Sequence, residues 1–490
     1  MTRDAGAGAG AGDLLIGRIR ERLPALRLLT EASDREAYRR DETAHLHPGL
    51  PLAVAFPTST AEVSILVRLA AEHGVPIVPR GAGTGLSGGA AGIEGGLTVV
   101  LSRMDRILGI DREDLVAVVQ PGIVNAVLKA AVGDEGLSYP PDPASYETCS
   151  IGGNLGTNAG GLCCVKYGQT RESVLGLEVV LADGRVIRTG GRNVKDVAGY
   201  ALTQLFVGSQ GTLGIVTEAT LRLRPAPPPR STLLAFFPTF EAAGQAVHLM
   251  TAAGLSPVTL ELMDRVTIAA VDDWHGLGLD RDAAAMLMVE SDLPGAAATD
   301  ELDRAAAACS GAGSSWVVRA ADPAEADWLR QGRRMAYHAL ERLGVARMED
   351  VAVPRSRITE LIRAIEAIGE RHGVTVGTFG HVGDGNLHPT FVFGRDDPSA
   401  EAVAEAARAD LYRAALGLGG TITAEHGIGL ARRAFLAEQV GPDVVDVMRS
   451  IKRALDPKGI LNPDKVLPPE QGRTAATLRR PVSDAETVTR

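Results

Sequence analysis

The sequence has few cysteines and few aromatic residues, and it contains no long apolar run. Four cysteines in 490 residues do not make a disulfide framework, and none has the Cys-x-x-Cys spacing of zinc or iron–sulfur sites. No apolar run reaches the ~18 residues of a membrane-spanning helix. The first residues carry an early acid and then alternate alanine with glycine, which is not typical of a signal peptide. These absences predict a cytoplasmic protein.

Positive charge is not concentrated anywhere in the chain. The formal net charge is −10, no cluster of Lys and Arg stands out, and only 4% of the residues are aromatic. Neither nucleic acid nor an anionic membrane surface is therefore expected as a partner. The 45% of hydrophobic and 22% of charged residues are typical of a globular protein, and the length predicts several domains of ~150 residues each.

Glycine, proline and residue periodicity divide the chain into two bodies. Residues 1–12 and 468–490 are low in complexity or polar, and we expect them to be disordered. Residues 45–226 are rich in glycine, whereas strands and helices alternate over 227–467, and a proline-rich stretch separates the two. The second body is expected to form an antiparallel sheet with helices on one face, so the fold class is α+β.

Local signals predict several elements with definite ends. Ser59 and Glu62 form a capping box at the start of a helix that should end near Gly74. Further helices are expected over 123–132, 358–372, 401–416 and 443–455, and from residues 241, 296 and 324. Strands are expected over 76–79, 97–101, 115–120, 175–181, 215–223, 233–237, 258–263, 285–289 and 315–318.

Two distant segments, 380–388 and 424–427, concentrate ionisable side chains among glycines. If residues 383–386 form a hairpin turn, His381 lies opposite His388, with Cβ atoms ~5 Å apart. Two such imidazoles can bind one divalent cation, and Glu425 can complete the ligand set. His426 would then be free to move a proton. The alternative is two ordinary loop histidines and a solvated carboxylate.

Three glycine-rich loops lie in the first body. The loop over 79–89 follows an apolar strand and contains Gly-x-Gly-x-x-Gly at Gly83, Gly85 and Gly88. A Rossmann fingerprint must open a helix, but the glycines of residues 90–96 do not sustain one. Successive unobstructed backbone N–H groups predict a phosphate nest instead, with a flexible loop as the alternative. The loops 150–161 and 208–214 have the same character, and three nests suit a long ligand such as a dinucleotide.

Together these segments resemble a known flavoprotein family. The loop 79–89, the segment 140–161 and the segment 208–217 are similar to the FAD-binding domain of the vanillyl-alcohol oxidase / p-cresol methylhydroxylase superfamily. Residues 381–388 (HVGDGNLH), 425–429 (EHGIG) and 456–465 resemble its D-2-hydroxyacid dehydrogenase branch, which includes the glycolate oxidase flavin subunit and D-lactate dehydrogenases. The resemblance implies a two-part FAD-binding domain over 45–226. An α+β substrate (cap) domain over 227–467 follows, whose C-terminal segment returns to the flavin.

The resemblance also implies FAD and the positions that bind it. The first loop would bind the pyrophosphate, the second segment would line the flavin and ribityl chain, and the third would pack near the adenine. Thr84 stands where relatives with covalent FAD place a histidine, so a dissociable FAD is expected, and Gln210 replaces the usual glutamate of the third loop. The residues implied are Pro79, Arg80, Gly81, Ala82, Gly83, Thr84, Gly85, Ser87, Pro141, Asp142, Ser150, Gly153, Asn154, Asn158, Ala159, Gly160, Gly211, Ile215, Val216 and Asn462.

By the same resemblance the reaction would oxidise a 2-hydroxyacid, with hydride passing to flavin N5. A divalent metal, zinc or manganese, on His381, His388 and Glu425 would act as a Lewis acid on the substrate hydroxyl. His426 would be the general base.

Two further residues have two possible roles each. Arg333 matches the family arginine that binds the substrate carboxylate, or else it is a solvated helix arginine. Asn386 is either a neighbour of the substrate or a turn residue. We carry both forward as candidate catalytic residues.

Met348 stands where the 2-hydroxyglutarate branch carries a lysine, which favours a small substrate, D-lactate or glycolate. The alternatives are D-2-hydroxyglutarate dehydrogenase, a metal-independent flavin oxidase or synthase of the superfamily, and a flavin-binding subunit without catalysis of its own. Electrons would pass to a separate acceptor, namely a quinone, a cytochrome, an electron-transfer flavoprotein or an iron–sulfur subunit. The protein is expected in the cytoplasm or peripherally at the inner face of the membrane, and a homodimer is compatible with these expectations.

Overall fold

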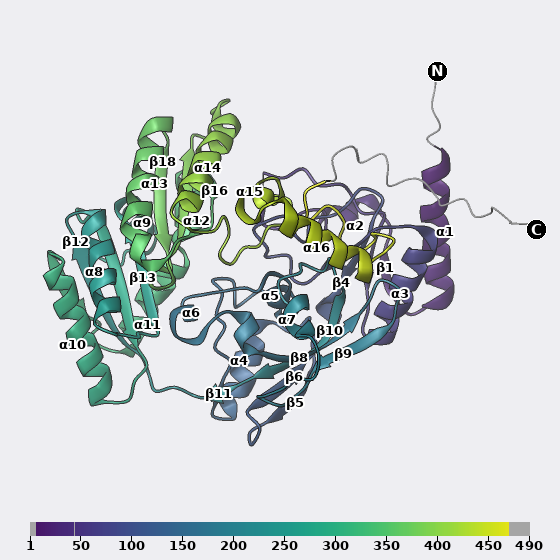
Figure 1. Cartoon of the computed structure of the whole chain (residues 1–490), viewed down its shortest axis with the longest axis horizontal. Coiled ribbons are helices and arrows are strands. Elements are labelled where there is room, and N and C mark those ends of the chain that lie inside the picture. The colour runs from purple at the N-terminus through teal and green to yellow at the C-terminus, as the bar shows by residue number, and fades with distance from the viewer. Residues whose placement is uncertain (1–5, 44, 470–490) are drawn as a thin grey trace, which may run out of the picture.

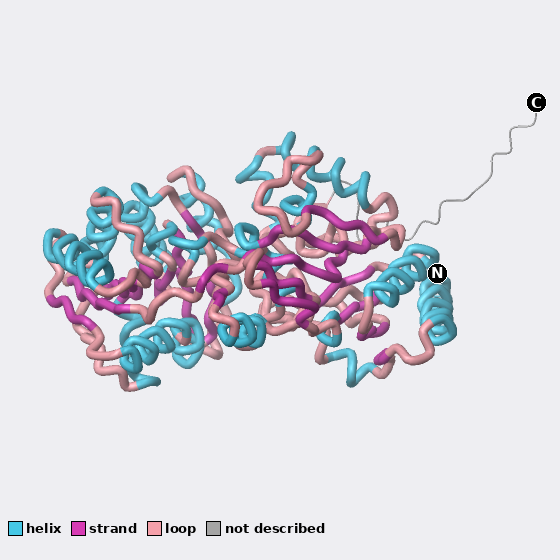
Figure 2. The backbone as a smooth tube through the Cα atoms, turned by 90° about the horizontal axis from the view of Figure 1, so that it is seen from below, coloured by secondary structure: helices cyan, strands magenta, loops and turns pink. Residues whose placement is uncertain are grey.

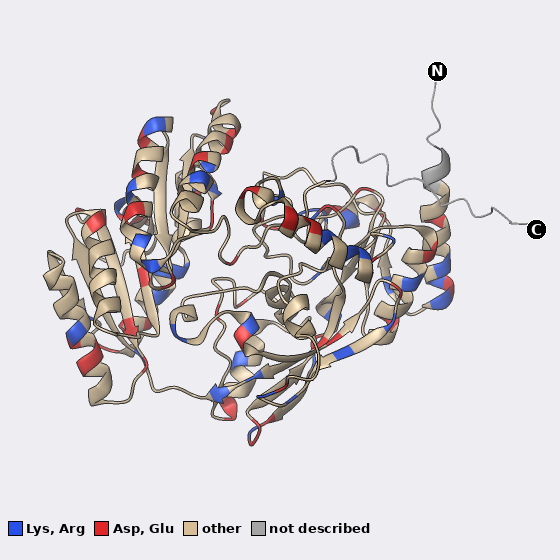
Figure 3. Ribbon diagram, viewed as in Figure 1, with Lys and Arg blue, Asp and Glu red and all other residues tan. Residues whose placement is uncertain are grey.

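The computed structural model describes residues 6–43 and 45–469. The disorder expected for residues 1–5 and 470–490 lies outside this part of the chain. The first body (6–225) and the second body (226–422) lie side by side, and the C-terminal residues 436–469 return to the first (Figure 1). Acidic and basic residues are intermixed over both bodies (Figure 3).

The described part of the chain begins with helix α1 (Gly6–Arg22), so a helix stands where residues 6–12 were expected to be disordered. Leu15 and Ile19 of this helix are fully buried in the same apolar cluster as Val63 and Leu66 of α3 (Thr60–His73). The alternating alanine and glycine gave no helical pattern in the sequence. The helix forms because its second half packs on α3, and such tertiary packing overrides weak local propensity.

The first body contains two main sheets. One has the order β1-β2-β4-β3, in which β4 pairs in parallel with β2 and with β3. The other is antiparallel, with the order β5-β6-β10-β8-β9. Helix α3 connects β2 to β3, and its two ends are as predicted: Ser59 caps it by accepting a hydrogen bond from Glu62 N, and Gly74 ends it at a φ of 66°.

The elements of the first body have the following bounds. Strands are β1 (Arg27–Leu29), β2 (Ala53–Phe56), β3 (Ile77–Arg80), β4 (Leu97–Val100), β5 (Ile107–Asp111), β6 (Val116–Val119), β7 (Leu137–Ser138), β8 (Val174–Val180), β9 (Val186–Gly190), β10 (Ile215–Arg222) and β11 (Arg224–Pro225). Helices after α1 and α3 are α2 (Ala32–Glu36), α4 (Asn125–Asp134), α5 (Ile151–Thr157), α6 (Cys164–Tyr167) and α7 (Leu202–Phe206).

The second body is built on one antiparallel sheet, as expected, but helices cover both of its faces. Its order is β15-β12-β14-β13-β18-β19-β16, with β17 also paired to β19. In β12, Leu233 and Phe237 point to one apolar cluster and Leu234 and Phe236 to another, because successive side chains alternate across a strand. Figure 2 shows helices above and below these strands. The expectation of helices on one face is therefore wrong.

The elements of the second body and of the C-terminal stretch have the following bounds. Strands are β12 (Ser231–Phe237), β13 (Thr259–Asp264), β14 (Ala285–Ser291), β15 (Trp316–Arg319), β16 (Val345–Met348), β17 (Val351–Ala352), β18 (Thr375–Gly380) and β19 (Asn386–Phe393). Helices are α8 (Phe240–Ala252), α9 (Arg265–His275), α10 (Ala296–Gly311), α11 (Pro323–Arg334), α12 (Ala336–Leu343), α13 (Ile358–His372), α14 (Ala400–Gly417), α15 (Leu436–Val440) and α16 (Pro442–Leu455).

The predicted register of the histidine hairpin is wrong. Strand β18 ends at Gly380, and His388 lies opposite Phe379 rather than opposite His381. His381 belongs to the connection, where its carbonyl accepts hydrogen bonds from Asp384 N and Asn386 N. Gly385 closes this turn at a φ of 79°. The connection is thus longer than the expected hairpin turn, since it begins at His381 rather than at Gly383.

The C-terminal residues extend the first body. Ile460 and Leu461 are buried in the apolar cluster of the β1-β2-β4-β3 sheet, and Leu461 forms a parallel bridge with Ile77. Asn462 N donates to Ile77 O over 2.7 Å. Across residues 6–43 and 45–469, no helix is long and apolar enough to span a membrane.

Candidate active site

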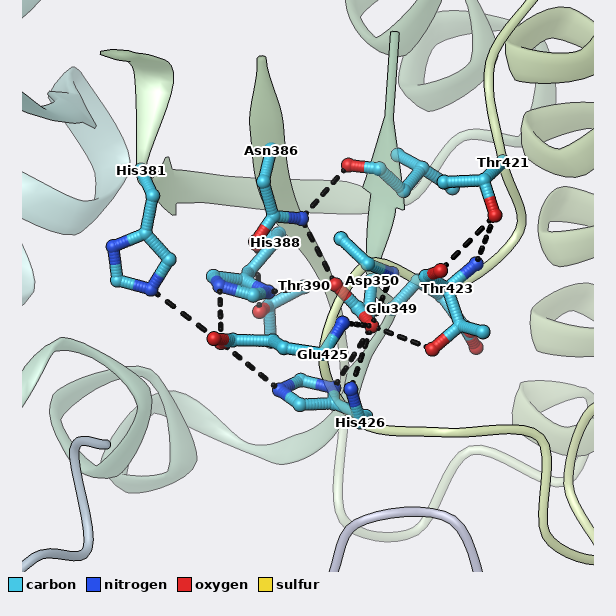
Figure 4. Close-up of polar contacts among 12 residues, drawn as sticks. Glu349, Asp350, His381, Asn386, His388, Thr390, Thr421, Thr423, Glu425 and His426 are labelled. Atoms are coloured by element: carbon cyan, nitrogen blue, oxygen red, sulfur yellow. Dashed lines mark hydrogen bonds and ion pairs between the residues drawn. The ribbon is translucent and has the colours of Figure 1, made fainter. Parts of the chain in front are cut away.

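Three imidazoles converge on one carboxylate (Figure 4). Glu425 Oε1 lies 3.4 Å from His381 Nε2, 3.3 Å from His388 Nε2 and 3.7 Å from His426 Nε2. The rings of His388 and His426 are stacked with centroids 5.0 Å apart. One ligand atom from each of His381, His388 and Glu425 lies within 4.8 Å of the others. The structure therefore brings together the three residues predicted to share a cation, with His426 beside them.

The other nitrogen of each imidazole faces a second carboxylate. His381 Nδ1 lies 2.7 Å from Glu261 Oε1. Asp350 faces the remaining two rings, with Oδ1 3.8 Å from His388 Nδ1 and Oδ2 3.9 Å from His426 Nδ1. Sequence reasoning missed both acids. Glu261 lies in an apolar strand, β13, which is a usable signal because a buried carboxylate needs a partner; Asp350 carries no comparable signal.

Asp350 is fully buried and holds the backbone that carries Glu425 and His426. Its Oδ2 accepts hydrogen bonds from Ala424 N, Glu425 N and His426 N over 2.8–2.9 Å, and from the Thr423 hydroxyl. Its Oδ1 accepts one from Asn386 Nδ2 over 2.9 Å. Charge-assisted bonds of this kind are about twice as strong as neutral ones. Asp350 thereby fixes the segment 423–426 against the second body.

The electrostatics of the cluster follow from burial and from these pairings. Burial alone would raise the pKa of Glu425, but His381 and His388 hold it well below its usual value. Burial opposes charge on His381 too, yet Glu261 and Glu425 raise the pKa of this imidazole well above its usual value. Burial lowers the pKa of His426 to about 4 despite the nearby Asp350. The neighbouring imidazoles therefore differ in charge: His381 is favoured as a cation and His426 as a neutral ring.

Arg333 lies at the end of α11 and is only 3% exposed, so it is not a solvated helix arginine. Its Nη2 is 2.5 Å from Glu261 Oε2, and its guanidinium lies over the Phe379 ring at 4.8 Å. Its buried Nε has no hydrogen-bond partner among the described residues. One carboxylate, Glu261, therefore contacts both His381 and this arginine.

Asn386 begins strand β19 and is not a turn residue. Both hydrogen bonds of its amide nitrogen are internal, to Asp350 Oδ1 and to Val351 O, each over 2.9 Å. Asn386 contributes to the cluster by holding Asp350.

The three glycine-rich segments of the first body meet at Gln210 and Asn462. Gln210 Nε2 donates to Ser87 Oγ of the first loop over 3.1 Å, and Gln210 N donates to Gly156 O of the second over 2.8 Å. Asn462 Nδ2 donates to Gly89 O and to Gln210 O over 2.9 and 2.6 Å. The first loop has no helix, as expected, so these residues are joined through backbone and amide groups.

The second segment is partly helical, which corrects the prediction of a loop. Helix α5 (Ile151–Thr157) begins at Ser150, whose Oγ accepts from Gly153 N over 3.2 Å, and it ends at Asn158 with a φ of 56°. A Cβ on Gly152 would lie 2.7 Å from Pro121 Cβ. The glycines thus serve close packing of this short helix as well as backbone exposure.

Comparisons with known proteins identify the family of this chain. Residues 51–190 match the family described as FAD binding domain, and residues 226–466 match FAD linked oxidases, C-terminal domain. The chain is 44% identical to the glycolate oxidase subunit GlcD of Bacillus subtilis, over 88% of this chain and 92% of that protein. It is 37% identical to a D-lactate dehydrogenase of Archaeoglobus fulgidus, over 88% of this chain and 96% of that one. This chain belongs to the FAD-linked oxidase family.

The resemblance inferred from the sequence is thereby confirmed, and the protein is an FAD-linked oxidoreductase that acts on a CH–OH group. The fold agrees as well. A structure of p-cresol methylhydroxylase superimposes with a TM-score of 0.80 at 18% identity, over 94% of this chain and 98% of that one. The FAD-linked oxidase therefore has the two-part architecture expected of that superfamily.

The residues of the first body fit FAD. A Cβ on Gly81 would overlap Ser150 Oγ, and a Cβ on Gly89 would lie 2.6 Å from Gln210 Nε2, so glycine keeps the loops close and their backbone open. Asn462 Oδ1 is buried without a hydrogen-bond partner among the described residues, which is the expected state of a group that contacts a cofactor.

His381 and His388 of the second body, together with Glu425 of the segment that follows it, fit a divalent cation. Each histidine offers Nε2, while its Nδ1 faces a carboxylate, which is the usual pattern around a protein-bound metal. Asp350, His388 and His426 form a second geometrically possible set. Asp350 already accepts five hydrogen bonds and has little capacity left for a cation, so the first set suits a metal better.

Proposed function

We propose that this FAD-linked oxidase oxidises a small D-2-hydroxyacid, D-lactate or glycolate, to the corresponding 2-oxoacid. The observation that carries the proposal is the convergence of His381, His388 and His426 on Glu425 beside a buried arginine. The relatives named as glycolate oxidase subunit and D-lactate dehydrogenase support the substrate class. When bound, non-covalent FAD accepts a hydride and a divalent cation, zinc or manganese, supplies Lewis acidity.

The chain's own residues would orient the substrate and take its proton. Arg333 has a buried, unpartnered Nε suited to the substrate carboxylate, and Glu261 contacts Nη2 of the same guanidinium. His426 Nε2 faces the site and can receive the hydroxyl proton, while Asp350 on the Nδ1 side stabilises the imidazolium that forms. This division of work resembles the pairing of a base with an orienting carboxylate in other enzymes.

The preference for a monocarboxylate rests on Met348. This residue ends β16 and packs in the same apolar cluster as Phe379, whose ring lies under Arg333. A thioether there offers no charge to a second carboxylate. D-Lactate and glycolate are therefore favoured over D-2-hydroxyglutarate.

The electron acceptor is a separate molecule in this proposal. All four cysteines are unbonded, and none belongs to a candidate metal cluster within the described residues. A quinone, a cytochrome, an electron-transfer flavoprotein or an iron–sulfur subunit would reoxidise the flavin.

Anaerobic flavin bleaching tests the proposal. Protein reconstituted with FAD and zinc(II) or manganese(II) should lose its flavin absorbance at ~450 nm when D-lactate or glycolate is added. L-lactate serves as the stereochemical control for lactate, and D-2-hydroxyglutarate tests the second carboxylate. A chelator should abolish bleaching, and added metal should restore it. Bleaching that survives full metal removal would show a metal-independent oxidase, and preferential bleaching by D-2-hydroxyglutarate would overturn the substrate assignment.

A further inference from the structure

The segment 423–429 lies between the two bodies, and two glutamines of the first body form hydrogen bonds with its backbone. On the side of the second body, Asp350 binds the backbone N–H groups of residues 424–426. On the other side, Gln169 binds the backbone just before Glu425 and Gln210 binds it just after His426. Both glutamines belong to the first body, whose loops fit FAD.

Gln169 joins the second glycine-rich segment to Ala424. Its Nε2 donates to Ala424 O over 2.8 Å, and its Oε1 accepts from Asn158 Nδ2 over 2.8 Å. Asn158 ends α5 in a left-handed conformation with a φ of 56° and is one of the expected FAD-binding residues. Both ends of the Gln169 amide are thus committed, one to a cofactor loop and one to the peptide preceding Glu425.

Gln210 makes the matching connection from the first loop to Gly429. Its Oε1 accepts from Gly429 N over 2.8 Å, and its Nε2 donates to Ser87 Oγ over 3.1 Å. The side chain is 7% exposed, and the backbone has a φ of 51°, which is strained for a residue other than glycine. A Cβ on Gly427 would lie 3.0 Å from Gln210 Nε2, so glycine leaves room for the amide.

A direct contact completes the connection. A Cβ on Gly160 would overlap Glu425 Oε2, so the peptide of the second glycine-rich segment lies against the carboxylate on which the imidazoles converge. A shift of that segment toward Glu425 would therefore displace the carboxylate.

We propose that Gln169 and Gln210 are positioning residues that couple the FAD loops to the candidate metal site, so that FAD and the divalent cation each tighten binding of the other. FAD would order Ser87 and Asn158, the two glutamines would transmit that order to residues 424–429, and Glu425 would be held ready for the cation. Coupling between two binding equilibria is reciprocal, and it typically amounts to about 5- to 150-fold. The inference rests on the proposed metal site.

The test measures two affinities rather than turnover. Protein is first stripped of FAD. Its affinity for zinc(II) is then determined by competition with a chromophoric chelator, before and after FAD is added back. The His381→Ala variant gives the background. We expect FAD to tighten zinc(II) binding by about tenfold. Zinc(II) should tighten FAD binding, followed by flavin fluorescence, by the same factor.

Gln169→Ala and Gln210→Ala should each lower this factor, and the double variant should bring it close to one. Gln439→Ala is the matched control, because Gln439 binds Thr421 and Ile422 N in the same part of the chain but contacts no FAD loop. The control should keep the full factor. Gln210→Glu keeps the acceptor for Gly429 N, and its second oxygen can accept from the Ser87 hydroxyl in place of the native bond donated to it. This variant should therefore restore most of what Gln210→Ala loses.

The outcomes separate this inference from the proposed function. Absence of specific zinc(II) and manganese(II) binding to the FAD-loaded protein would overturn the metal site and the coupling with it. Specific binding that is the same with and without FAD would overturn the coupling alone. An unchanged factor in Gln169→Ala, or an equal loss in Gln439→Ala, would also overturn it. Gln169→Ala leaves the strained residue intact, so it decides the matter even if Gln210→Ala does not fold.

Discussion

The two halves of the active centre are built from different materials. The second body contributes ionisable side chains: His381 and His388 on the β18–β19 connection and strand, with Asp350 and Glu261 behind them. The first body contributes backbone groups and neutral amides, kept close to one another by glycines such as Gly81 and Gly160. Substitutions that keep shape but remove charge should therefore damage the cluster of ionisable side chains in the second body. Substitutions that add volume should damage the glycine-rich loops of the first body.

Glu425→Gln should have the largest effect, because it keeps the shape of the side chain and removes the charge on which three Nε2 atoms converge. We expect loss of the bound cation and a fall in kcat of roughly 1,000-fold, equivalent to about 4 kcal/mol in activation free energy. Metal analysis and anaerobic flavin reduction measure the two losses. Asp384→Asn makes the same charge change in the turn after His381 and should keep the metal. Full activity of Glu425→Gln would contradict the role given to the Glu425 charge.

Asp350→Asn should have the next largest effect, and it should appear in stability. An amide nitrogen in place of Oδ2 would face three backbone N–H donors instead of accepting from them. We expect a loss of about 3 kcal/mol in the free energy of unfolding, as for other broken buried charge networks. A urea titration measures this loss in the free energy of unfolding. Asp303→Asn, which removes an exposed carboxylate from Arg319, should change stability by under about 1 kcal/mol. Equal losses in the two variants would refute the argument.

Gly160→Ala tests the expectation that added volume damages the glycine-rich segments of the first body. The added methyl group would overlap Glu425 Oε2, so the carboxylate must move away from the imidazoles. We expect zinc(II) affinity to fall about tenfold, or about 1.4 kcal/mol, although no ligand changes. The chelator competition assay measures this. Gly133→Ala is the control, since Gly133 lies in α4 with nothing near its Cβ position, and it should stabilise the helix by about 0.5–1 kcal/mol.

Ser150→Ala should have the smallest effect. The Ser150 hydroxyl caps α5, and removing a helix cap typically lowers stability by about 1 kcal/mol. Because no charge is removed and space is gained opposite Gly81, FAD should still bind. Thermal unfolding and FAD fluorescence measure the two properties. A complete loss of FAD from this variant would show that the hydroxyl contacts the cofactor directly. That result would contradict the view that the first body contributes mainly backbone groups and neutral amides.

Local sequence signals were sufficient for elements whose ends are set within a few residues. Helix α3 was predicted from its capping box at Ser59 and from Gly74, and α13 was predicted with its observed bounds, where Gly373 ends it at a φ of 61°. Helix α1 was missed because its amphipathic part covers only a few residues and depends on α3. The second covered face of the second-body sheet was missed, although the continuous apolar run from Leu233 to Phe237 in β12 is typical of a strand buried on both faces.

The candidate site was only partly accessible to sequence reasoning. The identity of its donors followed from where His381, His388, Glu425 and His426 stand among glycines, yet the pairing of the two hairpin histidines was wrong by register. The carboxylate Glu261 comes from a strand 120 residues before His381 and could not be paired with it from spacing. Arg333 was identified through family resemblance, and only the fold showed that Glu261 joins it to His381.

The sequence alone determined which donors exist, which loops could expose their backbone, and which helices begin and end where local caps place them. Only the tertiary structure decided which donors meet, because sheet register, the turn at His381 and the return of residues 456–465 depend on contacts between segments far apart in the chain. Asp350 shows the physical reason. Its carboxylate must find three N–H groups more than 70 residues away, and that meeting is stabilised by the packing of whole bodies rather than by any local preference.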